Sequence, residues 1–413
     1  MCLSGRQHQA LHDGYRTDRM KKILFVDDEP KVLEALQRML RIMRHEWEME
    51  FATNGQKALE ILEKEPHDVI VTDMRMPGMD GAQLLKEVKE RFPRLVRIIL
   101  SGQTDQEAFL SSARIVHQFL SKPCNMELLK TTIERTCALQ NLLKSELLRQ
   151  VALQIESLPS QSNLYEELKE TLQYPNVSME TIGKIISRDI GMTAKIIQLV
   201  NSAYYGMRRR IANPTEAVIV LGVDVIKSLV LMYNIFSHFN NVQLPEFSAE
   251  MLWKHSSATG AFARKIAMME NYKPADDALV AGLLHDLGTL ALIAHLPSQY
   301  KKALELTRKE NIPIPEAEQK ILNGTHAEFG EYLIGLWGIA DTIVEALALH
   351  HSPGRSTDKS FTLITAVHVA DVLANEIYPV ENSARMKVDF DYIAKTGMAD
   401  RFSMWRESCL SAF

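Results

Sequence analysis

Acidic, hydroxyl and lysine side chains stand at the ends of apolar runs in the first third of the sequence. Asp27 and Asp28 follow KKILFV, Asp73 ends DVIVTD, and VRIILS and HQFLSK end in Ser101 and Lys122. Two or three carboxylates at one place suit Mg²⁺, which takes few protein oxygens and keeps several waters. An aspartate beside that ion is a credible nucleophile toward a phosphoryl donor. We therefore predict phosphoryl transfer to Asp73, with Lys122 neutralising and Ser101 hydrogen-bonding the transferred group.

A second set of candidate ligands lies in the C-terminal half. Histidines and aspartates occur in apolar, helix-like segments such as LLHDLGTL (283–290): they are His255, His285, Asp286, His326, His350, His351 and Asp371. Imidazoles and carboxylates suit iron, manganese or zinc, and an adjacent His-Asp pair can serve two metals from one helix end. A lone histidine is more often a hydrogen-bonded core residue. The residues alone leave metal binding and plain core packing both open.

Apolar strand-like runs alternate with amphipathic segments from residue 21 to about residue 126, one such helical segment being 105–115. Five strand–helix units predict a doubly wound, five-stranded parallel sheet covered by helices on both faces. Ligands of such a sheet bind where the carboxyl ends of the strands converge. That edge is where the acidic, hydroxyl and lysine side chains stand.

The last helix of this domain is expected to continue as one connector over 127–157. An apolar stripe runs along it to the break near Pro159, formed by Leu129, Ile133, Thr136, Leu139, Leu143, Leu147 and Val151. The stripe could pair with a second copy to give a homodimer, or it could pack on its own chain. About three heptads do not decide between these alternatives.

Strand signals almost vanish after Pro159, and helical segments separated by Gly and Pro follow one another. We expect an all-α domain over 158–380, a C-terminal helix and tail over 381–413, and a disordered tail over 1–20. Met1 and Met20 are both candidate start residues.

Composition narrows the class of protein. The 413 residues suggest two or three domains, and 46% hydrophobic with 24% charged residues is ordinary for globular domains. We see no secretory signal or membrane span, and the four cysteines form no C-x-x-C pair, so we expect a cytoplasmic protein with reduced thiols. A net charge of −5 and the lack of a basic helix-turn-helix after the sheet domain argue against direct DNA binding.

Residues 21 to about 145 resemble the receiver domain of bacterial two-component response regulators. The likeness rests on VDDEP (26–30), VTDMRMPGMDG (71–81), ILSG (99–102) and FLSKP (119–123), which occur in that order. It implies a phosphoacceptor, Asp73, that is charged by a cognate histidine kinase or phosphotransfer protein. It further implies that Mg²⁺ is bound by Asp27, Asp28, Asp73 and the Arg75 carbonyl. The switch and phosphate-binding residues that it implies are Ser101, Phe119 and Lys122.

Residues 155 to about 375 resemble the HDOD output domain. The matching segments are NSAYYG (201–206), PTEAVIVLG (214–222), WKHS (253–256) and LLHDLGTL. This family is regarded as a regulatory module whose partners are mostly undefined. The resemblance therefore implies a non-catalytic output that acts on a downstream signalling protein still to be identified.

The same helical half also resembles the HD superfamily of metal-dependent phosphohydrolases. His255, the pair His285-Asp286 and Asp371 follow its order, and His326, His350 and His351 occupy the extra ligand places of the HD-GYP branch. Thr289 stands where lysine usually follows HD-x-G, and the Gly-Tyr-Pro loop is missing. We prefer a switch over an enzyme; the alternative is a receiver-controlled phosphodiesterase acting on cyclic di-GMP or another nucleotide.

Overall fold

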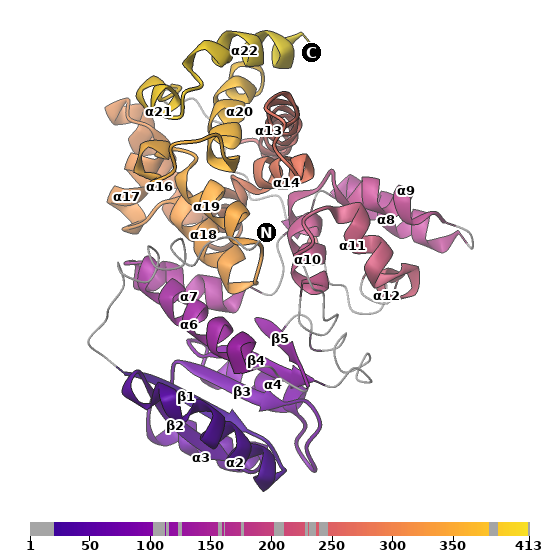
Figure 1. The fold of residues 1–413 in the computed structure, drawn as a ribbon, viewed down its shortest axis with the longest axis vertical. Coiled ribbons are helices and arrows are strands. Elements are labelled where there is room, and N and C mark those ends of the chain that lie inside the picture. The colour runs from indigo at the N-terminus through magenta and orange to yellow at the C-terminus, as the bar shows by residue number, and fades with distance from the viewer. Residues whose placement is uncertain are drawn as a thin grey trace. The chain divides into compact units, whose positions relative to one another are not determined.

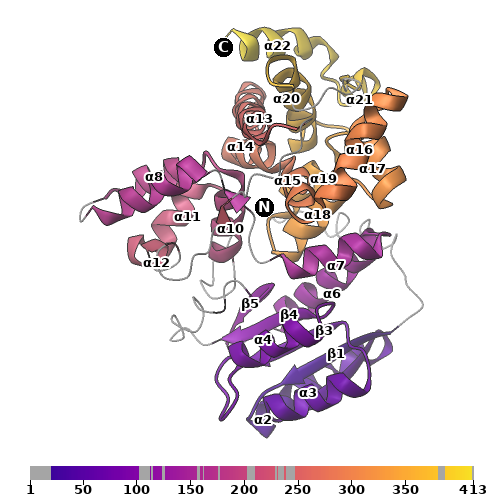
Figure 2. The ribbon, with the colours of Figure 1, turned by 180° about the vertical axis from the view of Figure 1, so that it is seen from behind.

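The protein forms two units, drawn in Figure 1 and from behind in Figure 2. The computed structural model describes residues 20–101, 112, 115–122, 126–155, 159–160, 162–174, 177–201, 210–227, 230, 237–238, 247–379 and 387–411. The described residues up to 155 belong to the first unit, and those from 159 onward belong to the second. The expected disordered tail, 1–20, lies outside the described residues except for Met20.

The first unit is built on a five-stranded parallel sheet with strand order β2-β1-β3-β4-β5. Its strands are β1 (Lys21–Val26), β2 (Trp47–Ala52), β3 (Val69–Asp73), β4 (Val96–Ser101) and β5 (Gln118–Ser121). Every residue of β3 is buried, as expected of a central strand covered on both faces. The order reverses between β1 and β3, which places the ligand crevice beyond the carboxyl ends of these strands. The predicted doubly wound sheet is confirmed.

Local caps set where the helices of this unit begin. The Asn54 side chain accepts the Lys57 N–H (2.9 Å) at the start of α3, and Asp80 and Gln83 form a capping box at the start of α4. The described helices are α2 (Pro30–Met39), η1 (Leu40–His45), α3 (Gly55–Lys64), α4 (Gly81–Arg91), α6 (Met126–Leu142) and α7 (Glu146–Gln154). The helix expected over 105–115 lies outside the described residues, apart from Ser112 and Ile115.

The second unit is helical, as predicted. Its helices before the C-terminal segment are α8 (Ser162–Gln173), α9 (Met179–Ile186), α10 (Ile190–Val200), α11 (Pro214–Leu221), α12 (Val223–Lys227), α13 (Ala249–Met269), α14 (Ala275–Leu284), α15 (Leu287–His295), α16 (Pro297–Glu310), α17 (Ile314–Leu322), α18 (His326–Leu336), α19 (Asp341–Leu349), η4 (Pro353–Arg355) and α20 (Leu363–Ile377). Two-residue strands, β6 (Pro159–Ser160) and β7 (Ser237–His238), pair beside them. Helix α13 packs on α14 and α20, and α18 packs on α15 and α19.

The C-terminal segment 387–411 is a packed part of the second unit. It forms α21 (Phe390–Lys395), η5 (Ala399–Arg401) and α22 (Phe402–Leu410), whereas we expected one helix and a tail. Trp405 is fully buried, and its indole N–H donates to Glu270 Oε1 (2.8 Å). Arg401 donates to the same oxygen (2.8 Å). An apolar anchor with a satisfied polar atom explains why this segment is ordered.

One helical segment, Ala275–His295, is long and apolar enough to cross a membrane by length and composition. However, 83% of its most apolar window is buried inside the protein. A core helix of a globular domain has the same length and composition, so this segment is weak support for a membrane span.

The connector is two helices, and our expectation of one continuous helix over 127–157 is wrong. Helix α6 ends at Leu142, and α7 starts anew behind Ser145, whose hydroxyl accepts the Leu148 N–H (3.4 Å). Most described side chains of the apolar stripe, namely Leu129, Ile133, Thr136 and Leu143, are buried within the first unit, while Leu147 is 39% exposed. The side chain of Leu139 is outside the described set. The stripe thus packs mainly on its own chain, and a homodimer stays a prediction.

A buried arginine fastens the end of α7 to the sheet. Arg97 on β4 donates through Nη2 to the Leu153 carbonyl (2.8 Å), and through Nε and Nη1 to the carbonyls of Ile115 and Leu95. His117 Nδ1 accepts the Arg97 backbone N–H (3.0 Å), so its Nε2 carries the proton and donates to Leu153 (3.1 Å). Burial lowers the pKa of Arg97 to about 10, which still leaves it charged at neutral pH. A cation therefore satisfies one of the last, otherwise unpaired carbonyls of α7.

We expect Arg97→Met to loosen α7 while the sheet stays folded. Hydrogen bonds from a charged donor contribute about 1.5–3 kcal/mol, so the amides of α7 should exchange about 10- to 100-fold faster in hydrogen-exchange mass spectrometry. Arg94→Ala is the matched control, because the ion pair of Arg94 with Glu146 of α7 (3.2 Å) is exposed and should matter little. Unchanged exchange in Arg97→Met would show that the buried contact does not hold α7.

Candidate phosphorylation and metal sites

Asp27, Asp73 and Lys122 meet at the carboxyl ends of β1, β3 and β5. Lys122 Nζ lies 2.8 Å from Asp27 Oδ2 and 2.6 Å from Asp73 Oδ1. Burial raises the pKa of Asp73 more than the hydrogen bond from Lys122 lowers it. Burial also lowers the pKa of Lys122, but its hydrogen bonds to the two aspartates outweigh this and raise that pKa overall. The pair of acids therefore has a permanent cation beside it, as a site for phosphoryl oxygens requires.

The other residues predicted for this site are only partly described. Asp28 is half-buried beside Asp27, Phe119 is buried on β5, and the Arg75 side chain is exposed. Ser101 ends β4 next to Asp73, but its side chain is outside the described set. At Gly81 a Cβ would overlap the Asp73 carbonyl oxygen, so the loop after β3 can close in this way only with glycine.

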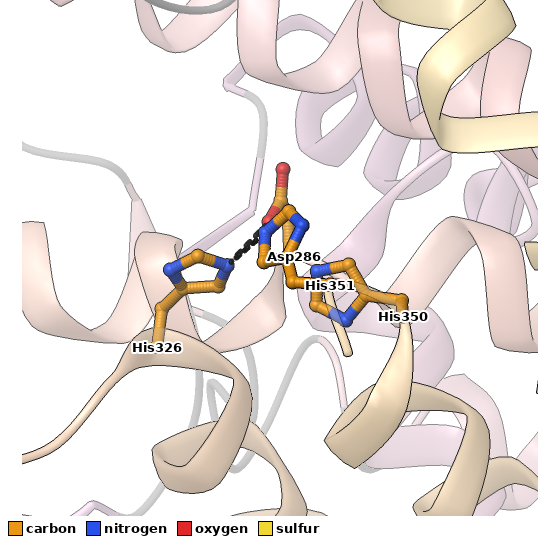
Figure 3. A group of neighbouring side chains, drawn as sticks. All are labelled: Asp286, His326, His350 and His351. Atoms are coloured by element: carbon orange, nitrogen blue, oxygen red, sulfur yellow. Dashed lines mark hydrogen bonds and ion pairs between the residues drawn. The ribbon is translucent and has the colours of Figure 1, made fainter. Parts of the chain in front are cut away.

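The seven candidate metal ligands of the second unit converge in two neighbouring groups. Asp286, His326, His350 and His351 form the first group, and His255, His285 and Asp371 form the second; within each group the possible ligand atoms lie within 4.8 Å of one another. Figure 3 shows the four side chains of the first group around one point, with His326 facing Asp286. His351 is half-buried and the other six are buried.

Six helices bring the ligands together. His255 lies on α13, and His285 and Asp286 form the junction between α14 and α15. The remaining ligands come from the start of α18, the end of α19 and the middle of α20, namely His326, His350 with His351, and Asp371. The packing of α13 on α14 and α20, and of α18 on α15 and α19, therefore sets the geometry of the cluster.

Each aspartate faces both groups with different oxygens. Asp286 Oδ2 lies 3.3 Å from His285 Nε2, while its Oδ1 lies 3.4 Å from His326 Nε2. Asp371 Oδ1 lies 3.1 Å from His255 Nε2, while its Oδ2 lies 3.7 Å from His351 Nδ1. Carboxylates placed between two ligand groups are what a two-metal site requires.

Hydrogen bonds on the far side of three imidazoles turn their lone pairs into the cluster. Nδ1 donates to the Gly282 carbonyl in His285 (2.7 Å), and to the Leu347 carbonyl in His350 (2.6 Å). In His326 it donates to the Glu318 carboxylate (2.7 Å). These acceptors carry no proton, so in the neutral rings each Nε2 is unprotonated.

Several buried nitrogens of the cluster lack a hydrogen-bond partner among the described residues. They are His350 Nε2, His255 Nδ1 and His351 Nδ1. An unsatisfied buried polar atom is costly, and lone pairs gathered beside two carboxylates repel one another unless a cation lies between them. The donor set therefore fits one or two ions of iron, manganese or zinc.

Charge in the cluster is set by competition between burial and neighbouring groups. Burial would raise the pKa of Asp286, but the imidazoles around it, His285 first, hold that pKa well below its usual range. Burial lowers the pKa of His350 far below its ordinary value and that of His351 to about 3. Burial also opposes charge on His285, but Asp286 and Asp371 together raise its pKa well above normal. Two rings are thus neutral and ready to coordinate, while a metal must displace a proton from His285.

Two families of known proteins match the two units of the chain. The receiver domain family of response regulators matches residues 23–134, and the HDOD domain family matches residues 158–353. This chain is a receiver–HDOD response regulator. Asp371 lies beyond the matched HDOD residues, on α20.

Individual relatives match parts of this receiver–HDOD regulator. An uncharacterized protein of Treponema pallidum is 27% identical over 234 residues, 55% of this chain and 44% of that protein. The hydrogenase transcriptional regulatory protein HoxA of Cupriavidus necator is 34% identical over 128 residues, 30% of this chain and 26% of HoxA. The chain spans less than half the length of these curated relatives.

A solved structure shows the same fold. The MmoQ response regulator of Methylococcus capsulatus aligns with a TM-score of 0.50 at 21% identity, over 60% of this chain and 98% of MmoQ. At that identity the likeness shows the fold alone.

Glycines at two helix crossings let the ligand-bearing elements approach. A Cβ at Gly282 on α14 would lie 2.7 Å from the Gly260 Cα on α13, the crossing that places His285 beside His255. A Cβ at Gly288 on α15 would overlap the His326 carbonyl oxygen at the start of α18. The glycine of the LLHDLGTL motif is therefore required by the backbone approach that brings His326 to Asp286.

Two buried side chains that support the cluster were missed in the sequence. Glu318 accepts from both the backbone N–H and Nδ1 of His326, and His368 donates to the His350 carbonyl (2.7 Å). His368 Nε2 also accepts the Asp389 N–H (2.9 Å), which ties the C-terminal segment to the same region. Glu318 lies in IPEAEQKIL, where its charge looks like that of an exposed helix face. Only the tertiary contact distinguishes it.

We expect Gly288→Ala to destabilise the metal-free protein by about 1–3 kcal/mol, because the new methyl group must push α18 away from α15. Gly330→Ala is the matched control at the same crossing, since its Cβ would meet Gly288 and Leu347 at ordinary distances of 3.4–3.7 Å. It should be neutral or stabilise by up to about 1 kcal/mol. Urea unfolding of both variants measures the difference. Equal effects would mean that the α15–α18 approach is not under steric constraint.

Proposed function

We propose that this response regulator accepts a phosphoryl group on Asp73 and relays the signal to an HDOD domain that contains a two-metal centre. The convergence of seven ligands, six of them buried, with lone pairs and carboxylates turned toward one another, is the observation that carries the proposal. The metal centre is a structural and regulatory element of an output that acts by binding a downstream signalling protein.

The receiver half of the proposal rests on the contacts around Asp73. A receiver domain implies a phosphodonor such as a histidine kinase. Mg²⁺, held by the carboxylates of Asp27, Asp28 and Asp73 and the Arg75 carbonyl, would offset the charge of the phosphoryl oxygens. Asp73 supplies the nucleophilic oxygen, and Lys122, already 2.6 Å from it, stabilises the added negative charge.

The strands at this site offer a route for the response. The new charge gives Ser101, at the end of β4, a phosphoryl oxygen to hydrogen-bond, and the buried aromatic ring of Phe119 on neighbouring β5 can follow that movement. At the opposite ends of these strands, Arg97 near the start of β4 and His117 directly before β5 both donate hydrogen bonds to the Leu153 carbonyl of α7. Strain at the phosphorylation site can thus reach the connector along two adjacent strands.

In the HDOD domain we assign two neighbouring metal positions. One is held by Asp286, His326, His350 and His351, and the other by His255, His285 and Asp371, with Asp286 facing both. Iron, manganese or zinc would supply the positive charge that this donor set needs. The hydrogen-bonded Nδ1 atoms keep three of the imidazoles oriented for that role.

Two features weigh against phosphodiesterase activity of the HD-GYP type. Thr289, at the position where those enzymes usually carry lysine, is buried on α15 and brings no positive charge. The chain after His351 enters the short η4 turn, Pro353–Arg355, without a Gly-Tyr-Pro loop. We therefore propose that the output is non-catalytic. We further propose that the protein is cytoplasmic, does not insert into a membrane and does not bind DNA directly.

We expect Asp73→Asn to abolish phosphorylation. With Mg²⁺ and a small phosphodonor such as acetyl phosphate, the wild-type protein should gain acid-labile, hydroxylamine-sensitive phosphate, while Asp73→Asn gains none because the amide is not nucleophilic. Asp80→Asn is the control, since Asp80 only caps α4 in the same loop and asparagine can also cap a helix. Incorporation at the wild-type rate in Asp73→Asn would refute the assignment.

We expect the purified wild-type protein to carry iron, manganese or zinc, up to about two ions per chain, and Asp286→Ala to lose both because Asp286 faces both groups. Elemental analysis after gel filtration measures this, with Asp276→Asn, on α14 outside the cluster, as the control. The metal-loaded wild type should not hydrolyse cyclic di-GMP.

Two results would contradict this picture. The proposed metal centre would be refuted if the wild-type protein contained no metal and Asp286→Ala had the same stability as the wild type. Robust cyclic di-GMP turnover that Asp286→Ala abolishes would establish the phosphodiesterase instead. Unfolding curves for each variant identify a loss of metal that is caused by misfolding.

A further inference from the structure

We infer that Glu318 is a positioning carboxylate that makes the two metal positions unequal, strengthening the one that contains His326. The inference rests on the proposed metal centre and adds to it a residue that controls one ion without touching either. Glu318 lies on α17, outside every ligand-bearing element.

The contacts of Glu318 are concentrated on one ligand. Its side chain is fully buried, and Oε2 accepts the His326 backbone N–H (2.9 Å) and Nδ1 (2.7 Å). Its second oxygen, Oε1, has no hydrogen-bond partner among the described residues. A buried carboxylate is costly unless something of opposite charge compensates it. A metal-bound imidazole, whose N–H is strongly polarised, is such a partner.

Capping of α18 does not account for this arrangement. Thr325 and Glu328 already form a capping box at the start of that helix. A cap would need only the backbone N–H of His326, whereas Glu318 also holds the ring nitrogen. The contact with the ring of His326 therefore does more than cap the start of the helix.

The three imidazoles with a fixed Nδ1 differ in what holds them. His285 and His350 donate to neutral backbone carbonyls, and His326 donates to a carboxylate. A negative acceptor increases the electron density that the imidazole offers to a metal more than a carbonyl does. His255, in the other group, has no partner for Nδ1 among the described residues. The group of Asp286, His326, His350 and His351 should therefore bind its ion more tightly.

The test is metal titration of the full-length protein after chelation. Mn²⁺ or Zn²⁺ added to wild type should bind in two steps of different affinity. Glu318→Gln keeps the shape and can keep both hydrogen bonds, but it removes the negative charge. We expect it to weaken the tighter step by about 10- to 100-fold and to leave the weaker step unchanged. Glu328→Gln, in the capping box of the same helix, is the control and should alter neither step, because glutamine can also complete a capping box.

The outcomes separate this inference from the proposal beneath it. Two unchanged binding steps in Glu318→Gln would overturn the role of Glu318 while leaving the metal centre intact. Wild-type protein that binds no metal would overturn both. If Glu318→Gln does not fold, Glu318→Asp is titrated instead: it keeps the charge but withdraws the oxygen from His326, so an unchanged tighter step would equally contradict the inference.

Discussion

Buried lone pairs and carboxylates that face one another need a compensating positive charge, and this constraint organises the helical half of the protein. Six of the seven clustered ligands are buried, and several of their nitrogens have no hydrogen-bond partner among the described residues. A protein interior tolerates such a group only if a cation or proton is shared within it. The helix crossings at Gly282 and Gly288 and the support from Glu318 are consequences of holding these groups at close range.

The acidic side chains of the two halves of the chain have different kinds of charged partner. At the sheet edge, Lys122 supplies a built-in cation and Asp73 retains access to a phosphoryl donor. In the helical unit, no lysine or arginine among the described residues pairs with Asp286 or Asp371, and the ion-pair partners of both aspartates are histidines. The first arrangement suits a phosphoryl group that is added and removed, and the second suits a metal ion that stays bound. This contrast is the physical reason for assigning a signal input to one half and a stable metal centre to the other.

The sequence predicted those parts of the structure that follow from periodicity. Parallel strands must converge at their carboxyl ends, so the meeting of Asp27, Asp73 and Lys122 could be foreseen, and clustered histidines in apolar helices pointed to a shared site. The break at Ser145 was missed because a serine inside an apolar repeat signals a new helix only once its hydroxyl is seen to cap one. Glu318 was missed because periodicity tells which face of a helix is buried, but not what that face meets.

The most direct test of the metal centre is anomalous diffraction from crystals of the full-length protein, recorded above and below the absorption edges of iron, manganese and zinc. The account predicts two anomalous peaks about 3.5–4 Å apart, one beside His326 and one beside His255, with Asp286 between them. A cluster filled with water, with no anomalous signal at any of the three edges, would contradict it.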